Sequence, residues 1–418
     1  MSRGVTRPAV VHPIILGGDA GAYSLARAFH EAYGVHSTVV SIVSTRNMRY
    51  SQILTNVIEP RLDDPEVMVA TIRRLAAQAT APVMVVTCTD WYVRALSEQR
   101  AKIEDVAVVP YTSVDLLDRV MDKQRFSELC HELGVPHPRT VVRRGGEHVG
   151  ELGLRFPIVA KPGDNVAYHH TSFAGKQKVH HLTDVSQLEW LLRAAGEAGY
   201  REPFIIQEFV PGNDSQMQIM TTFSAQDGTV RMAHGGRVLI EEHTPGTLGN
   251  PAAILTEVLP QVEADARRLV EHLGWTGFAN FDIKVDPRDG RAHFFELNPR
   301  TGRSNYYLTA SGINPVTYWV GEHLQQGRTP DPRRVPILYR IVPGPLLKKY
   351  LPSMSDPTVA TRLKKVRRVA HPLKYSRDRD PRRSLWVLLS ELKQYKKFAQ
   401  FYPVSAAQAA AHRQGGGA

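Results

Sequence analysis

Two carboxylates and an amide that could bind a divalent cation stand close together in residues 277–298. Asp282 lies in the apolar run FANFDIKVD, and Glu296 and Asn298 lie in FFELNP, with the turn-forming residues DPRDG between the runs. Alternate residues of a strand point to one face, so Glu296 and Asn298 project together, and a tight hairpin brings Asp282 alongside. Such oxygen ligands suit Mg2+, which takes its remaining ligands from phosphates and water. A magnesium site is therefore predicted, and a solvent-facing polar row is the alternative.

Basic residues that suit phosphate or carboxylate groups occur on both sides of this hairpin. Arg300 and Arg303 follow it in NPRTGRSN, and a guanidinium can donate two parallel hydrogen bonds to a carboxylate or phosphoryl group. The alternative is that these arginines only pair with the hairpin acids. Upstream, Lys161 ends the apolar run FPIVAK, and Lys123 opens a predicted helix. Both lysines are placed as nucleotide phosphates would require, although most lysines are merely solvated.

A polar loop and a strand end add groups that suit a nucleotide. The loop at 163–175 contains Ser172 and other hydroxyl, imidazole and glycine residues, which offer donors to phosphates, but it is not a Walker A loop. Its histidines are interpreted as polar loop residues and not as metal ligands. In QEFVPGND, Glu208 ends a predicted strand and Asp214 follows soon after. This order suits an adenine amine, an adenine ring and ribose hydroxyls in turn.

The elements that must position these residues alternate between strand and helix. The N-terminal part predicts a parallel α/β sheet, with a turn GGDAG that resembles only half of a dinucleotide fingerprint. Its predicted strands are 9–17, 37–43, 83–87 and 106–110, around a helix at 23–33. Further helices are predicted at 122–133, 185–198 and 263–273. The remaining predicted strands are 156–162, 176–181, 204–209, 216–223, 230–240, 277–285 and 292–297.

The net positive charge of the chain is concentrated in its C-terminal part. From Lys348 on there are 16 Lys and Arg against four acids, so the preceding part is nearly neutral. The stretch SLWVLLSELKQYKKFAQFY is amphipathic, with Trp386, Leu389, Leu392 and Tyr395 at helical spacing. Packing of this helix on its own protein is favoured, and contact with an anionic surface or a UDP-linked or lipid-linked precursor is the alternative.

The remaining composition points to the cytoplasm. Cys88 and Cys130 lack neighbours at metal-ligand spacing and are predicted to be small core residues, as expected in a reducing compartment. Residues 1–8 carry no apolar h-region, and no run of 18 apolar residues occurs, so neither a signal peptide nor a spanning helix is predicted. A cytoplasmic protein is expected, with peripheral contact at the inner membrane face as an open alternative.

In this order the residues resemble the ATP-grasp ligases, and more narrowly the bacterial D-aspartate ligases, which attach D-aspartate to the lysine side chain of peptidoglycan precursors. The resemblance extends over residues 12–325, through segments such as IQEFVPGNDS, TGFANFDIKVDPRDG and ELNPRTGRSNYYLT. It implies a Rossmann-like domain at 1–120, a small subdomain with a phosphate loop at 121–200, a large subdomain with the magnesium hairpin at 201–330 and a basic helical extension at 331–418.

The resemblance also implies roles for the site residues. Lys123 and Lys161 would hold the α- and β-phosphates of ATP, and Asp282, Glu296 and Asn298 would hold two Mg2+ ions, with Mn2+ as a substitute. Arg300, Arg303 and Lys161 would be catalytic, the arginines by orienting the acceptor carboxylate or an acyl-phosphate. The implied ATP-binding residues are Lys123, Lys161, Ser172, Lys178, Gln207, Glu208, Phe209, Val210 and Asp214.

One departure from the family pattern affects the expected mechanism. Many members carry an arginine two positions before the first metal aspartate, where this chain has Asn280. Transition-state charge would then fall to Arg300, Lys284 or Arg237. The implied activity is an ATP-dependent carboxylate–amine ligase, and the substrate is an amino acid with an amine acceptor. One alternative is a peptide or natural-product ligase that uses other amino acids. The other is a nucleic-acid or membrane-surface binding protein with a vestigial nucleotide site, although no nucleic-acid partner is expected.

Overall fold

The computed structural model describes residues 10–164, 167–168, 170–177, 179–324, 334–354 and 356–412. The chain forms two compact units. Unit 1 contains Met1–Leu117, Gly212–Asp282 and Asn298–Ala418, and unit 2 contains Asp118–Pro211 and Ile283–Leu297. The domain boundaries proposed from the sequence stay a prediction.

The first part of unit 1 is a parallel sheet with strand order β3-β2-β1-β4. Its strands are β1 (His12–Leu16), β2 (Ser37–Ser41), β3 (Leu54–Ile58) and β4 (Val83–Thr87), joined by α1 (Ala20–Tyr33) and α2 (Pro65–Ala76) and followed by α3 (Asp90–Glu98) and η1 (Arg100–Lys102). Strands β1, β2 and β4 are buried almost throughout, as expected of a sheet with both faces covered. The predicted α/β class is confirmed. The strand predicted at 106–110 is wrong, because Val108 makes only an isolated bridge to Met84.

A seven-stranded sheet with order β13-β12-β9-β10-β11-β14-β15 follows. The strands are β9 (Met217–Ser224), β10 (Val230–Glu241), β11 (Pro251–Glu257), β12 (Gly277–Val285), β13 (Ala292–Asn298), β14 (Ile337–Arg340) and β15 (Arg368–Ala370), with η2 (Asp214–Gln216) before β9 and α8 (Pro260–His272) before β12. The predicted strands in β9, β10, β12 and β13 are confirmed, and β11, β14 and β15 were not predicted. The β12–β13 hairpin belongs to unit 1 at Asp282 and Asn298 and to unit 2 between them.

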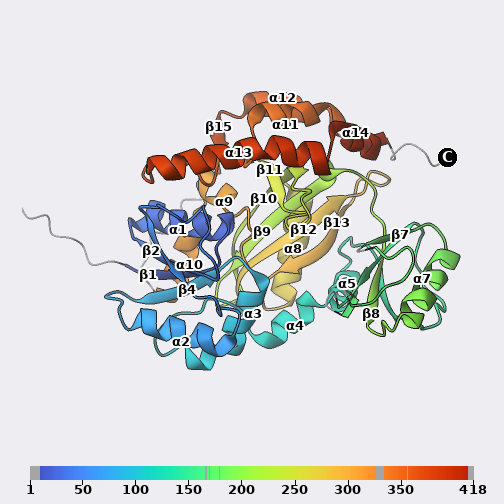
Figure 1. Ribbon diagram of the computed structural model, residues 1–418, viewed down its shortest axis with the longest axis horizontal. Helices are drawn as coiled ribbons and strands as arrows, with labels where there is room; N and C mark the ends of the chain where they lie inside the picture. The colour runs from blue at the N-terminus through green and yellow to red at the C-terminus, as the bar shows by residue number, and fades with distance from the viewer. Residues whose placement is uncertain are drawn as a thin grey trace, which may run out of the picture. The chain divides into compact units, whose positions relative to one another are not determined.

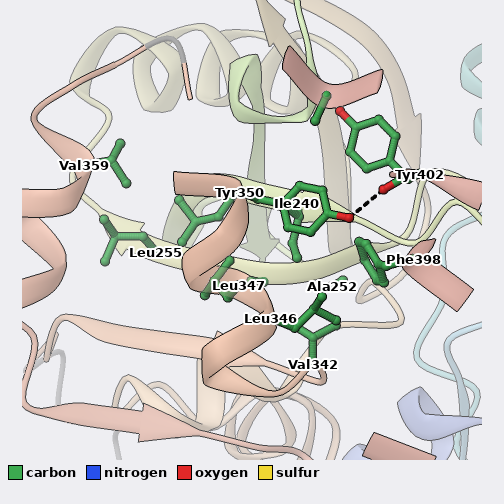
Figure 2. Packing of buried hydrophobic residues seen from close by; sticks show 13 residues of the cluster. Ile240, Ala252, Leu255, Val342, Leu346, Leu347, Tyr350, Val359, Phe398 and Tyr402 are labelled. Carbon is green, nitrogen blue, oxygen red and sulfur yellow. Dashed lines mark hydrogen bonds between the residues drawn. The ribbon is translucent and has the colours of Figure 1, made fainter. Parts of the chain in front are cut away.

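Helices from the C-terminal part complete the core of unit 1 (Figure 1). After α9 (Tyr306–Ala310) and α10 (Pro315–Leu324) come α11 (Gly344–Tyr350), η3 (Leu351–Ser353), α12 (Val359–Lys365), α13 (Pro381–Phe401) and α14 (Val404–His412). Figure 2 shows residues of this extension, among them Leu346, Tyr350, Phe398 and Tyr402, packed together with Ile240 of β10. The extension is therefore part of the folded core and not a loose tail.

Helix α13 packs through a different face from the one expected. Its buried residues are Arg383, Val387, Glu391, Gln394 and Phe398, so the predicted helix is confirmed but the predicted stripe is only partly buried. Leu392 of that stripe is exposed, whereas Trp386 lies beneath the Arg46 guanidinium at 3.7 Å from its ring centroid. Polar anchors such as Arg383, which pairs with Asp378 at 3.2 Å, define the packed face and are invisible to a hydrophobic pattern.

Unit 2 is built on an antiparallel sheet with order β5-β8-β6-β7. Its strands are β5 (Thr140–Arg144), β6 (Ile158–Pro162), β7 (His180–Leu182) and β8 (Pro203–Glu208), with α5 (Lys123–Glu132) and α7 (Val185–Glu197); α4 (Val114–Met121) leads into it. Both predicted helices are confirmed, and Asp122 and Asp184 cap them. The returning strand begins at His180 and not, as predicted, at residue 176. A core that includes Tyr168, Tyr200 and Phe204 holds the sheet.

Candidate active site

In unit 2, the predicted phosphate lysine lies beside a predicted metal ligand. Lys123 Nζ is 3.0 Å from Glu296 Oε2, and each side chain is 37% exposed. Lys123 is the first residue of α5, where the Asp122 carboxylate accepts a hydrogen bond from the backbone N–H of Arg125. An exposed ion pair of this kind contributes at most about 1 kcal/mol, so either partner can be recruited by a charged ligand at little cost.

The other nucleotide residues predicted in unit 2 lie on neighbouring strands and just beyond. Strands β6 and β8 pair so that Lys161 is opposite Ile205, which places Lys161 one strand away from the segment 207–210. Glu208 ends β8, and its carboxylate accepts a hydrogen bond from the backbone N–H of Arg155 at 2.9 Å. Lys161 and the predicted adenine segment therefore lie on paired strands of the same sheet or directly after them.

Two apolar residues, Phe209 and Val210, directly follow β8. The Phe209 ring meets the His181 ring edge-on at 5.4 Å, and Lys284 Nζ lies 5.7 Å from the centre of the Phe209 ring. Val210 is buried, whereas Ser172 is exposed on its loop, and Gln207 donates to Thr140 Oγ1 at 2.9 Å. Lys178 lies outside the described residues.

In unit 1, the two other predicted metal ligands are adjacent. Asn298 Nδ2 donates to Asp282 Oδ2 and to the Asn280 carbonyl, each at 3.3 Å. Asn280, where an arginine was expected, is buried, and its side-chain oxygen accepts a hydrogen bond from Thr221 Oγ1 at 2.8 Å. The Asp282 carboxylate and the Asn298 amide oxygen are donors of the kind that Mg2+ takes, and their role as metal ligands stays a prediction.

Of the three residues considered as substitutes for the missing arginine, Arg300 contacts Asn298, one of the predicted metal ligands. Arg300 Nη2 lies 3.3 Å from Asn298 Oδ1 and donates to Asp90 Oδ2 at 2.7 Å. Burial lowers the pKa of the Arg300 guanidinium, but the Asp90 carboxylate and other anionic groups outweigh this, and the net shift is upward. Arg237 is instead bound to Glu257 at 3.0 Å. Arg300 is therefore a permanent cation next to Asn298.

Arg303 is the centre of a second charged group. Arg303 Nε lies 3.1 Å from Asp19 Oδ2, and its Nη1 is hydrogen-bonded to the nearly fully buried Glu242. Asp19 also caps α1, because its Oδ1 accepts hydrogen bonds from the N–H groups of Gly21 and Ala22, each at 3.0 Å. Both predicted arginines are therefore already paired with acids, and those acids do not come from the hairpin.

Cys88 packs beside the Arg303 group. Its thiol lies 3.7 Å from Asp19 Oδ1, and a Cβ on Gly21 would lie only 2.5 Å from its sulfur and 3.1 Å from the Arg303 Cα. Burial raises the pKa of the Cys88 thiol, and the charge of Asp19 adds to this increase. Both cysteines are buried and neither forms a disulfide, which confirms their predicted place in the core.

Asp19 and Asp90, the acids that pair with Arg303 and Arg300, were not predicted as site residues, although their positions after neighbouring strands could have indicated it. Asp19 follows β1 and Asp90 follows β4, and these parallel strands are neighbours, so their carboxyl ends meet at one edge of the sheet. Ligands bind at such edges in open parallel sheets. Only GGDAG was considered in the sequence, and Asp90 in CTDW was not.

Asp214, the predicted ribose residue, is held by three donors within unit 1. Its Oδ2 accepts from the Glu241 backbone N–H and lies the same distance, 2.9 Å, from His243 Nε2. The Tyr402 hydroxyl is hydrogen-bonded to the same carboxylate. None of these three partners was predicted.

Comparison with known proteins supplies the context for these residues. No family model matches the chain. A D-aspartate ligase from Enterococcus faecium (strain Aus0004) is 30% identical over 395 residues, which cover 90% of this chain and 93% of that protein.

Two solved structures show the fold. The N5-carboxyaminoimidazole ribonucleotide synthetase from Thermus thermophilus aligns with a TM-score of 0.55 at 18% identity, covering 78% of this chain and 81% of that one. The L-amino acid ligase from Bacillus licheniformis aligns with a TM-score of 0.52 at 14% identity and 74% of each chain. The chain belongs to the D-aspartate ligase family of ATP-grasp carboxylate–amine ligases, and it is an ATP-dependent enzyme that forms carbon–nitrogen bonds.

Proposed function

We propose that the enzyme activates the side-chain carboxylate of D-aspartate, or of a similar amino acid, and joins it to the lysine amine of a peptidoglycan precursor. The observation that carries this proposal is the charged cluster of unit 1, in which two arginines alternate with three acids beside Asn298. The similarity to a D-aspartate ligase supplies the candidate amino acid.

The charge of the cluster favours an amino acid over a simple anion. Three carboxylates (Asp19, Asp90 and Glu242) face two guanidinium groups, so an anion alone would meet net negative charge. An amino acid presents an ammonium group for the acids and a carboxylate for the arginines, which matches both signs. Asp90 Oδ1 and Arg300 Nε are buried without a hydrogen-bond partner among the described residues, as expected of groups that await a polar ligand.

Asp19 is the acid that can best receive the ammonium group. Arg303 already has the buried Glu242 as a partner, so its charge stays compensated when Asp19 turns to a ligand. Asp19 is also the more accessible acid, with 40% of its side chain exposed against 4% for Glu242. The α-ammonium group of the substrate is therefore assigned to Asp19, and its α-carboxylate to Arg300 and Arg303.

ATP binding is assigned to the residues predicted from the sequence. Lys123 and Lys161 supply positive charge for the phosphates, residues 207–210 take the adenine and Asp214 accepts a hydrogen bond from the ribose. Asp282, Glu296 and Asn298 would hold Mg2+, which supplies charge neutralisation on the transferring phosphoryl group when bound.

The reaction follows from the poor reactivity of a carboxylate. A carboxylate oxygen attacks the γ-phosphorus of ATP, ADP leaves, and an acyl-phosphate forms. The amine then attacks the acyl carbon, loses a proton, and inorganic phosphate leaves with its bonding electrons. Arg300 stabilises negative charge near Asn298 throughout, and its fixed charge needs no reorganisation during the step.

Phosphate release tests the substrate assignment. With ATP and Mg2+, D-aspartate together with a UDP-linked muropeptide containing lysine is expected to stimulate phosphate release at least about tenfold over other D- and L-amino acids, because the site must match both charged groups. L-Aspartate and D-glutamate serve as controls for chirality and length. Stimulation by other amino acids alone would support the alternative, a peptide or natural-product ligase, and would remove D-aspartate from the proposal.

The exposed face of α13 fits an anionic lipid surface, consistent with a location at the inner membrane face. Leu385, Leu388 and Leu392 are each about half exposed at helical spacing, and Lys393 and Lys396 lie beside them. No described helix is long and apolar enough to span a bilayer.

Vesicle binding tests this surface without deleting the extension, whose residues belong to the core. Replacing the three leucines with serine is expected to abolish co-sedimentation with phosphatidylglycerol vesicles at low salt, because both apolar insertion and charge attraction are needed. The exposed Val258, outside the extension, provides a matched control as Val258→Ser. Equal binding of the triple variant, or equal binding of the wild type to phosphatidylcholine vesicles, would contradict the surface.

A further inference from the structure

The C-terminal extension contacts the segment that contains the proposed ribose residue at two adjacent positions. Asn213 Nδ2 donates to the Ser353 carbonyl of η3 at 2.6 Å, and both residues are buried. At the next position, the Asp214 carboxylate is hydrogen-bonded to the Tyr402 hydroxyl, from the junction between α13 and α14. Residues more than 130 positions away in the sequence thus hold this short segment in place.

Tyr402 also fixes the second partner of Asp214. Its ring stacks on the His243 ring with centroids 3.6 Å apart and planes within 6° of parallel. His243 Nε2 in turn lies 2.9 Å from Asp214 Oδ2. One tyrosine therefore sets both the position of the carboxylate, through its hydroxyl, and the plane of the imidazole, through its ring.

Tyr402 is itself firmly held, both at its backbone and at its ring. Its carbonyl accepts a hydrogen bond from the Tyr350 hydroxyl at 2.5 Å, drawn as the dashed line in Figure 2, and the two rings stack 5.8 Å apart. Pro403 follows directly and disfavours helical geometry at Tyr402, so α13 ends here. Only 9% of Tyr402 is exposed.

The hydrogen-bond capacity of Asp214 leaves room for a nucleotide. An ionised carboxylate has about four acceptor positions, and Glu241 N–H, His243 and the Tyr402 hydroxyl take three of them. The remaining position suits one ribose hydroxyl, and its direction is set by the three donors. We propose that Tyr402 is a positioning residue for ATP, through which the C-terminal extension orients Asp214 and His243 toward the ribose; this rests on the proposed assignment of Asp214.

Separate removal of the hydroxyl and the ring tests the proposal in the full-length enzyme. Tyr402→Phe keeps both ring stacks and is expected to raise the KM for ATP about 3- to 10-fold, with kcat and the KM for the amino acid within about twofold of wild type. Tyr402→Leu also loses the stack and is expected to raise the KM for ATP about 10-fold or more. The preference for ATP over 2′-deoxy-ATP or 3′-deoxy-ATP is expected to shrink in both variants.

Two companion variants separate a specific effect on ATP binding from a general one. Phe401→Ala changes an exposed neighbour at the end of α13 and is expected to leave the KM for ATP unchanged. Tyr350→Phe removes the bond to the Tyr402 carbonyl without touching Asp214, and a smaller rise in the KM for ATP is expected. Melting temperatures identify any variant that merely unfolds. Tyr402→Phe retains the aromatic ring that packs in the core, so this variant is expected to fold.

Asp214→Ala decides which assumption fails. If it raises the KM for ATP while both Tyr402 variants leave it within twofold of wild type, the role of Tyr402 is overturned and the ribose assignment stands. If Asp214→Ala itself has no effect on the KM for ATP, the ribose assignment is wrong and the role of Tyr402 falls with it. An equal rise in the KM values for ATP and amino acid would also overturn the positioning role, because it would indicate a general loss of structure.

Discussion

Replacing Glu296 with glutamine is expected to lower the rate of ATP turnover about 100-fold or more, because an amide is a far weaker Mg2+ ligand than a carboxylate. The substitution also removes the charge that pairs with Lys123 at 3.0 Å. That pair is exposed and contributes at most about 1 kcal/mol, so the variant is expected to fold normally. Steady-state ADP formation over a range of Mg2+ and Mn2+ concentrations measures the loss, and circular dichroism with a thermal melt measures the fold.

The β12–β13 hairpin provides its own control for Glu296→Gln. Asp289 lies at the exposed turn, and its carboxylate accepts a hydrogen bond from the Arg291 N–H at 2.9 Å, which an asparagine oxygen can also accept. Asp289→Asn makes the same acid-to-amide change in the same hairpin, and wild-type turnover is expected. ADP formation at the wild-type rate by Glu296→Gln would show that Glu296 does not bind the metal.

Replacing Asp19 with asparagine is expected to raise the KM for the amino acid about 10- to 100-fold, because a charge-assisted hydrogen bond to the ammonium group is lost. The KM for ATP is expected to change little. Asparagine is as good a helix N-cap as aspartate, so α1 keeps its cap, and Arg303 keeps Glu242 as its partner. D-Malate carries a hydroxyl in place of the ammonium group. In Asp19→Asn, the KM for D-malate is expected to be close to the KM for D-aspartate, whereas in the wild type it is expected to be higher.

A second capping residue serves as the control for Asp19→Asn. Asp64 caps α2 by accepting a hydrogen bond from the Glu66 N–H at 3.0 Å, and 36% of its side chain is exposed, similar to the 40% of Asp19. Asp64→Asn is therefore expected to leave both KM values unchanged. An unaltered preference for D-aspartate over D-malate in Asp19→Asn would remove Asp19 from the amino-acid site, even if the overall activity fell.

Local patterns were enough to predict the hairpin and the adjacency of two of its polar side chains. Strand alternation and a Pro- and Gly-containing turn define β12 and β13, and the bounds of β12 agree with those predicted. The adjacency of Asp282 and Asn298 at 3.3 Å follows from this pairing. The metal and nucleotide roles of these side chains stay predictions, because geometry alone does not identify a ligand.

Long-range pairing was not predictable from the same patterns. Strands β14 and β15 are only 4 and 3 residues long, so their sequences carry little periodicity. Arg303 pairs with Asp19 and Glu242, which come from separate segments of the chain. No local sequence pattern connects these three residues. Contacts such as Tyr402 with His243 depend in the same way on tertiary structure.

The construction of unit 1 from three separated stretches governs the order of events during synthesis. The strands β1–β4 pair among themselves within residues 12–87 and can assemble as soon as they leave the ribosome. The core around Ile240 waits much longer, because Phe398 and Tyr402 must be translated before they can fill it. A ribosome stalled before Tyr402 therefore carries a chain whose parallel sheet is formed but whose larger sheet still exposes apolar surface, which makes this late interval the one in which chaperone binding matters most.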